Sequence, residues 1–246
     1  MAIISLQATL SPLASTILAI GAAEIALDFH LTDPYTPTLP TGLYVLGLGV
    51  GPLLLAPCSE IHGRRVVYLC SFVIFTVLNV GCALSPNITT LSVLRLLSGC
   101  AGSAGPSLGA SSVGDMFRVE ERGRAQALYS FGPVVGPVIG GVIGGFIVYH
   151  THGWSWLIWI VAIASGVSNV LSVLFLQETY APYILRRKAA RLSKDNPEKT
   201  FRTESTMRPR DVYGRAITRP LRLLFTSPIC AFMSIYLSLS VETLAL

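Results

Sequence analysis

Long apolar runs separated by short polar stretches dominate the hydrophobic pattern of this chain. A helix needs about 20 apolar residues to cross the roughly 30 Å hydrocarbon core of a bilayer. Strands are not expected, because the runs are long and lack polar alternation. The pattern therefore predicts an all-α membrane protein with a bundle of six transmembrane helices and a partial seventh. The expected spans are Ala2–Ala23, Thr38–Pro57, Val66–Leu84, Thr90–Val113, Ala125–Tyr149, Ser155–Leu176 and Pro228–Leu246.

The first apolar run could also be a signal peptide, because it ends in small residues. It lacks the basic stretch that opens such a peptide, and its apolar part is long. We therefore interpret it as a membrane span, and we expect a preceding cytoplasmic tail that this chain does not include.

The positive charges predict the orientation of the spans. Arg64 and Arg65 lie in the second connection, and Arg118, Arg122 and Arg124 lie in the fourth. Twelve of the 18 Lys and Arg residues fall in the stretch 186–222, and the connections on the opposite side contain none. Because Lys and Arg are enriched in cytoplasmic loops, the three basic segments are expected on the cytoplasmic side.

The composition supports the membrane assignment and argues against other classes of protein. Apolar residues make up 52% of the chain, charged residues only 13%, and the mean hydropathy is +0.61, whereas soluble domains carry roughly 25% charged residues. The net charge of +5 suits a cytoplasmic membrane face, and no nucleic-acid-binding motif accompanies it. The five cysteines have no metal-ligand spacing, and the four histidines lie in loops or at interfaces. No metal site, cofactor or enzymatic constellation is therefore expected.

The stretch FGPVVGPVIGGVIGG (131–145) contains six Gly and two Pro residues inside an apolar span. In lipid such a helix can persist, because no water competes for its backbone and neighbouring helices satisfy the groups that Pro frees. Gly132, Gly136, Gly140 and Gly144 form one stripe, and the adjoining stripe consists of Pro133, Pro137, Gly141 and Gly145. This smooth surface allows close approach of another helix. The contact is either static or a sliding, bendable contact in a protein that changes shape.

Four motifs occur in order along the chain: GPLLLAPCSEIHGRR (51–65), Arg95 with Gly99 in the fourth span, the glycine stretch of the fifth span, and QETYAPYILRRKAARL (177–192) after the sixth. With these motifs the chain resembles the major facilitator superfamily, and in particular the twelve-span drug:proton antiporters of fungi. In the fifth span the residues that match the antiporter motif are Gly132, Gly136, Pro137, Gly140 and Gly141. The loop signature departs from the family at Glu60, where Asp is usual, and at Ile61, where a basic residue is usual.

The resemblance implies a conformational latch at the cytoplasmic ends of the spans. Its expected members are Glu60, Gly63, Arg64, Arg65 and Asp115. In the family such a cluster holds the two halves together in the outward-facing state and breaks on inward opening. The alternative for the two arginines is ordinary loop topology without a latch.

Arg95 is the one charged residue deep inside the first six predicted spans. A charge within the membrane is costly and marks a functional site, and the resemblance implies a role for Arg95 and Gly99 in proton coupling or in the structure of the cavity. The alternative is that Arg95 extends its side chain to the outer interface. No Asp or Glu lies in the middle of these spans, so the proton carrier is not assigned; Glu242 is a weak candidate.

The expected organisation is a six-helix bundle at 1–177, a basic cytoplasmic linker at 178–226 and the start of a seventh helix at 227–246, with the second half of the fold absent. The resemblance implies a secondary active transporter that exports small amphipathic or cationic compounds, such as drugs, toxins and polyamines, by proton-coupled alternating access. The second half would be required as a partner, and the plasma membrane is the expected location, with the vacuolar membrane as the alternative. A competing hypothesis is a truncated, non-transporting membrane protein or a half-transporter that needs a partner.

Overall fold

The computed structural model of the chain describes residues 1–31, 33, 35–151 and 153–195, together with the isolated positions 226, 229 and 232. Residues 1–203 form one compact unit and residues 204–246 form a second. All described elements of the first unit are helices, and the described residues contain no strand. The predicted seventh segment and Glu242 lie outside the described residues apart from positions 229 and 232, and the expected boundary at residue 177 stays a prediction.

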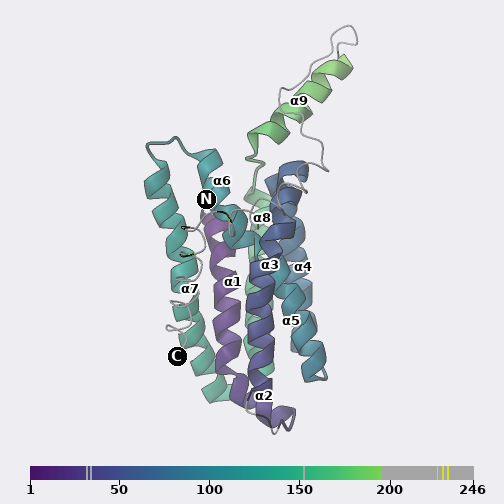
Figure 1. The fold of residues 1–246 in the computed structure, drawn as a ribbon, viewed down its shortest axis with the longest axis vertical. Coiled ribbons are helices and arrows are strands. Elements are labelled where there is room, and N and C mark those ends of the chain that lie inside the picture. The colour runs from purple at the N-terminus through teal and green to yellow at the C-terminus, as the bar shows by residue number, and fades with distance from the viewer. Residues whose placement is uncertain are drawn as a thin grey trace. The chain divides into compact units, whose positions relative to one another are not determined.

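The helices of the first unit run up and down, with successive long helices in opposite directions (Figure 1). The element bounds are α1 (Ala2–Ile20), α2 (Ala22–Asp28), a 3-10 turn η1 (Thr36–Thr38), α3 (Leu39–His62), α4 (Arg64–Ala83), α5 (Ile88–Gly102), α6 (Ala104–Met116), α7 (Arg122–Thr151), α8 (Trp154–Phe175) and α9 (Ala181–Asp195). We call one end of the bundle the basic end. It carries the start of α1, the connection between α3 and α4, and the end of α6.

Five helical stretches in the described part of the chain are long and apolar enough to cross a membrane: α1, η1 with α3, α4, α7 and α8. The fourth predicted span is the exception, because it is divided at Ser103 into α5 and α6. The predicted span at Thr90–Val113 is thus covered by two helices that meet at Ser103.

Pro106 gives a physical reason for this break. A proline has no backbone N–H, so Pro106 cannot donate the helical hydrogen bond to the carbonyl of Gly102. The hydroxyl of Ser11 on α1 donates to the Gly102 carbonyl instead. One turn further on, the phenol of Tyr129 on α7 donates to the carbonyl of Gly105 at 3.0 Å. Side chains of neighbouring helices thus satisfy the backbone where α5 meets α6.

The first connection is also more ordered than the sequence predicted. The first membrane helix ends at Ile20, and a second short helix, α2, then covers Ala22–Asp28. Residues 24–37, which were expected to form a loop, are thus partly helical. A Cβ atom on Gly21 would lie 2.6 Å from Cδ1 of Leu157, so the turn between α1 and α2 passes very close to α8.

The core of the first unit surrounds α1, which packs against α7, α8, α6 and α3. Its buried side chains include Ile4, Leu10 and Ile17 on α1, with Tyr44 and Phe72 on the facing helices. Many apolar side chains instead point outward, as on α7, where Val134 and Val142 are 70% and 72% exposed. Such an apolar surface suits hydrocarbon rather than water.

Candidate functional site

The basic end of the bundle carries a cluster of charged and polar groups around the turn from α3 to α4. The helix α3 ends at His62, and Gly63 adopts a φ of 90° before α4 begins at Arg64. A residue with a Cβ atom rarely adopts this φ, and a Cβ here would also collide with the carboxylate of Glu178. The backbone conformation of this turn therefore requires glycine at position 63.

Arg64 and Asp115 form the ion pair that connects α4 to α6. Arg64 Nε lies 2.7 Å from Asp115 Oδ2, and Arg64 Nη1 also donates to the hydroxyl of Ser111 on α6. The side chains are only 10% and 29% exposed, so the pair is partly shielded from water. The structure thus brings together two of the four charged residues that the sequence placed in the latch.

Glu178 is a member of this cluster that the sequence did not identify. Its carboxylate accepts hydrogen bonds from the backbone N–H groups of Arg64 at 2.9 Å and Arg65 at 3.1 Å. These N–H groups open α4 and have no partner within the helix, and a carboxylate also interacts favourably with the positive end of the helix dipole. Glu178 follows α8, so it ties the end of α8 to the start of α4.

The other expected latch residues have weaker contacts. The carboxylate of Glu60 makes no hydrogen bond or ion pair with any described residue, and its side chain is exposed. The guanidinium of Arg65 donates to the carbonyl of Val173 at 3.3 Å. Tyr180 contributes a ring whose centroid lies 5.3 Å from the Arg64 guanidinium carbon. Partial burial raises the pKa of the Tyr180 phenol, and the Glu60 carboxylate adds to this rise.

Arg95 lies fully buried on α5, with no exposed surface. Its Nη1 group donates to the carbonyl of Ala14 on α1 at 3.4 Å, and its guanidinium carbon lies 5.6 Å from the centroid of the Tyr44 ring. Its Nε and Nη2 groups have no hydrogen-bond partner among the described residues. In this structure the side chain stays within the bundle and does not extend to the outer interface.

Gly99 lies one turn after Arg95, where α5 crosses α3. A Cβ atom on Gly99 would lie 3.2 Å from the Cα atom of Gly47 on α3, and it would collide with the carbonyl of Tyr44. The two glycines therefore allow the helix backbones to touch. This close approach also brings the ring of Tyr44 beside Arg95, and the Tyr44 phenol donates to the carbonyl of Ser11 at 3.0 Å.

The glycine stripe of α7 packs against α1. A Cβ atom on Gly136 would lie 2.7 Å from the carbonyl oxygen of Thr9, and one on Gly140 would lie 3.0 Å from that of Leu13. Gly132 faces Ser5 and Thr9, and Gly144 faces Ile17. Successive glycines of α7 thus contact successive turns of α1, which explains their four-residue spacing.

The adjoining stripe faces a different way. A Cβ atom on Gly141 or on Gly145 would meet no atom within 4 Å, and Pro133 and Pro137 are not among the buried residues of α7. The antiporter motif predicted in this helix is thus divided. Gly132, Gly136 and Gly140 contact α1, whereas Pro137 and Gly141 belong to the open side of α7.

The opposite end of the bundle holds the acids of the first connection. Asp28 accepts a hydrogen bond from the indole N–H of Trp154 at 2.8 Å. Asp28, Glu24 and Trp154 belong to the lining of a pocket of about 340 Å³. No group of three or more His, Cys, Asp or Glu residues in the described part of the chain could hold a metal ion.

Comparison with known proteins places this architecture in a family. The family model described as Major Facilitator Superfamily matches residues 4–245. The chain is 42% identical to the MFS transporter cpaT of Aspergillus oryzae over 96% of the chain and 48% of that protein. It is 37% identical to the efflux pump radE of Floropilus chiversii over 96% of the chain and 44% of that protein. The chain thus spans about half the length of the curated relatives that it matches.

A solved structure shows the same fold at low sequence identity. The partially occluded, inward-open xylose transporter XylE from E. coli aligns over 96% of this chain and 61% of its own chain, with a TM-score of 0.69 and 14% identity. These similar proteins are transporters and not enzymes, as the sequence predicted. The predicted fold class is confirmed, and the chain is an integral membrane protein that belongs to the major facilitator superfamily.

Proposed function

We propose that this chain supplies one six-helix half of a secondary active transporter that exports small amphipathic or cationic compounds in exchange for protons. The buried guanidinium of Arg95 carries this proposal. It has no exposed surface, yet two of its nitrogens have no partner in the described part of the chain. Leaving a charged donor unpaired inside the membrane is costly, so such a residue marks a functional site. A relative at 37% identity is named an efflux pump, which supports export as the direction.

The arrangement of the helices supports alternating access. The carbonyl of Ala14, the ring of Tyr44 and the guanidinium of Arg95 meet where α1, α3 and α5 come together. The open side of α7, with Pro137 and Gly141, provides a smooth surface for a second helical half. The basic end would face the cytoplasm, because Lys and Arg favour that side, and the plasma membrane would be the location.

The ion pair between Arg64 and Asp115 would act as the latch on the cytoplasmic side. It connects α4 to α6, and the Glu178 carboxylate fixes the start of α4 beside it. Such a pair biases an equilibrium between two states only if its contacts differ between them. The latch therefore requires that a second half approaches this cluster in the outward-facing state and leaves it in the inward-facing state.

Efflux from vesicles tests the proposal. A chimera would carry this chain in place of the matching half of cpaT, and it would be compared with this chain alone. We expect the chimera to move a fluorescent lipophilic cation against its gradient when a proton gradient is imposed. The chain alone should insert without transport, because a two-sided cavity needs both halves.

Two variants of the chimera make the test specific. Arg95→Gln should abolish proton-driven movement while insertion persists, and Arg95→Lys should retain part of it because it keeps the charge. Proton-driven flux that is equal in Arg95→Gln and the parent would refute the role of Arg95. A neutral dye would be tested beside the lipophilic cation. A chimera that inserts but transports neither compound would favour the non-transporting alternative.

A further inference from the structure

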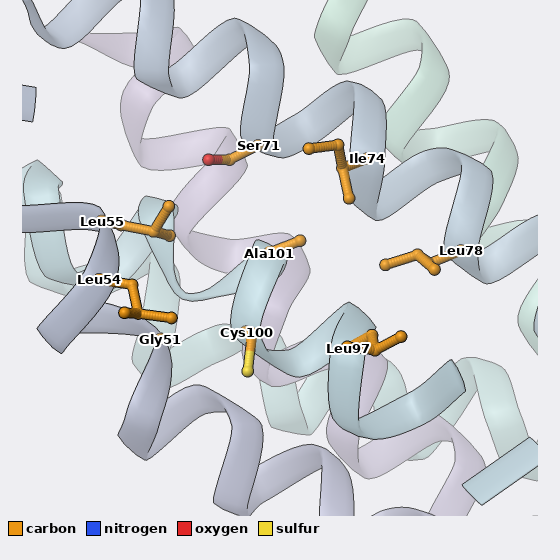
Figure 2. A pocket seen from close by; sticks show the side chains of 9 residues that line it. All are labelled: Gly51, Leu54, Leu55, Ser71, Ile74, Leu78, Leu97, Cys100 and Ala101. Carbon is orange, nitrogen blue, oxygen red and sulfur yellow. The ribbon is translucent and has the colours of Figure 1, made fainter. Parts of the chain in front are cut away.

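A lateral groove lies between α3, α4 and α5, and its lining includes neither Arg95 nor any residue of the basic-end cluster. It has a volume of about 310 Å³. Figure 2 shows its lining side chains, with Leu54 and Leu55 of α3 on one side and Ile74 and Leu78 of α4 on the other. The full lining is Gly51, Leu54, Leu55, Ser71, Ile74, Leu78, Leu97, Cys100 and Ala101.

The groove opens toward the apolar outer surface of the bundle. Leu54, Ile74 and Leu97 line it and are also 54%, 52% and 47% exposed. Neighbouring residues outside the groove, such as Val77 and Val93, are exposed and apolar as well. The groove is therefore continuous with the apolar outer surface of this unit, and its occupant would enter from that side.

Ser71 is the one residue with a hydroxyl in the lining of the groove. The residue is 4% exposed, and its hydroxyl makes no hydrogen bond with any described residue. The Ser71 hydroxyl oxygen is not among the fully enclosed polar atoms that lack a partner, so it opens into the groove between aliphatic side chains. The groove thus offers one hydrogen-bonding position in an otherwise apolar space, where the thiol of Cys100 is only a weak donor.

The shape of the groove suits a rigid, elongated ligand. Along α4 the lining extends from Ser71 to Leu78, which is about 10 Å of helix. Its volume is about twice that of an apolar cavity of roughly 150 Å³ that takes up benzene. An acyl chain would fill this space but would leave the Ser71 hydroxyl without a partner. A charged solute would lose its hydration without any compensating charge in the lining.

We propose that the lateral groove binds a membrane sterol, a lipid with a rigid apolar body and a single hydroxyl group. The sterol hydroxyl pairs with the Ser71 hydroxyl, and the ring system lies along Ile74, Leu78 and Leu97. The part of the ligand that extends beyond the groove remains in the surrounding hydrocarbon. This binding does not depend on the transport proposed above.

Photolabelling tests the groove directly. The chain would be reconstituted in phosphatidylcholine vesicles with a diazirine-bearing cholesterol analogue, and labelled peptides would be mapped by mass spectrometry. We expect saturable labelling of α3, α4 and α5 that excess unlabelled cholesterol removes. Ser71→Ala should raise the half-saturating sterol fraction about fivefold, because one hydrogen bond is lost. Labelling that does not saturate, or that excess phospholipid rather than cholesterol removes, would overturn the proposal.

A matched pair of variants on α5 separates the groove from the general lipid surface. Leu97 lines the groove, whereas Val93, one turn earlier and 52% exposed, does not. Leu97→Trp fills the space and should weaken labelling at least about fivefold, and Val93→Trp should leave it unchanged. Equal effects of the two variants would contradict binding in the groove.

The native thiols give a second measurement that needs no variant. Cys100 lines the groove, and Cys70 on α4 is exposed outside it. Cholesterol in the vesicles should slow the reaction of Cys100 with an apolar maleimide while Cys70 reacts at an unchanged rate. Protection of neither thiol, or of both equally, would count against the proposal.

Discussion

The contact between α7 and α1 can be tested by adding side-chain volume to one glycine stripe and not to the other. Gly136 faces α1, and a Cβ atom there would lie 2.7 Å from the carbonyl oxygen of Thr9. Gly141 lies on the same helix, and a Cβ atom there would meet nothing within 4 Å. Gly136→Leu and Gly141→Leu therefore add the same side chain to one helix in opposite packing environments.

The expected difference follows from the distances. In Gly136→Leu, the atom that the added side chain would meet first belongs to the backbone and cannot rotate away, so α1 and α7 must separate. Overpacking of this kind costs about 1–3 kcal/mol, and we take about 3 kcal/mol because a whole isobutyl group is added. For a chain of this length, that corresponds to a decrease of roughly 6–12 °C in Tm. Gly141→Leu should change the free energy of unfolding by no more than about 0.5 kcal/mol.

Thermal unfolding of this 246-residue chain in detergent, followed by circular dichroism, measures both variants. Gly136→Ala provides an intermediate step, because it adds only the Cβ atom and should lower Tm less than Gly136→Leu. The close-contact interpretation would be refuted by equal Tm values for Gly136→Leu and Gly141→Leu. It would also be refuted if Gly141→Leu were the more damaging of the two.

Three further predictions concern polar contacts between helices. In a double-mutant cycle with Arg64→Gln and Asp115→Asn, urea unfolding should give a coupling energy of about 1–2 kcal/mol, because the ion pair is partly buried. A coupling energy near zero would show that the pair does not contribute to the stability of the chain. Glu178→Ala should destabilise the chain by about 1 kcal/mol through the loss of the cap of α4, and Glu178→Gln should lose less; equal losses would argue against a hydrogen-bonded cap. Ser11→Ala should destabilise the folded chain by about 1–3 kcal/mol, because it leaves the buried carbonyl of Gly102 without a donor. This loss should be smaller in a Pro106→Ala background, where a backbone N–H is restored; an equal loss would contradict the idea that Ser11 replaces the missing N–H of Pro106.

The sequence by itself determined the class of the protein and the identity of its small-residue surfaces. Six membrane segments follow from hydropathy alone, because each span must be apolar over its own length whatever its neighbours are. The glycine spacing likewise predicted a helix face for close packing, since four-residue repeats lie on one side of a helix. Arg95 was identified by its charge alone, because any charge within a span is exceptional.

The tertiary structure decided which groups meet. The Glu178 carboxylate caps Arg64 across 114 residues, and Ser11 supplies the donor for Gly102 across 91 residues. Hydropathy and local motifs do not encode such pairings, because hydrogen bonds depend on positions that the whole bundle sets. The same reason explains why the sequence could not distinguish the stripe that packs on α1 from the stripe that remains open. Which helix faces another helix is decided by the packing of the bundle, and this chain contains glycine on both faces of α7.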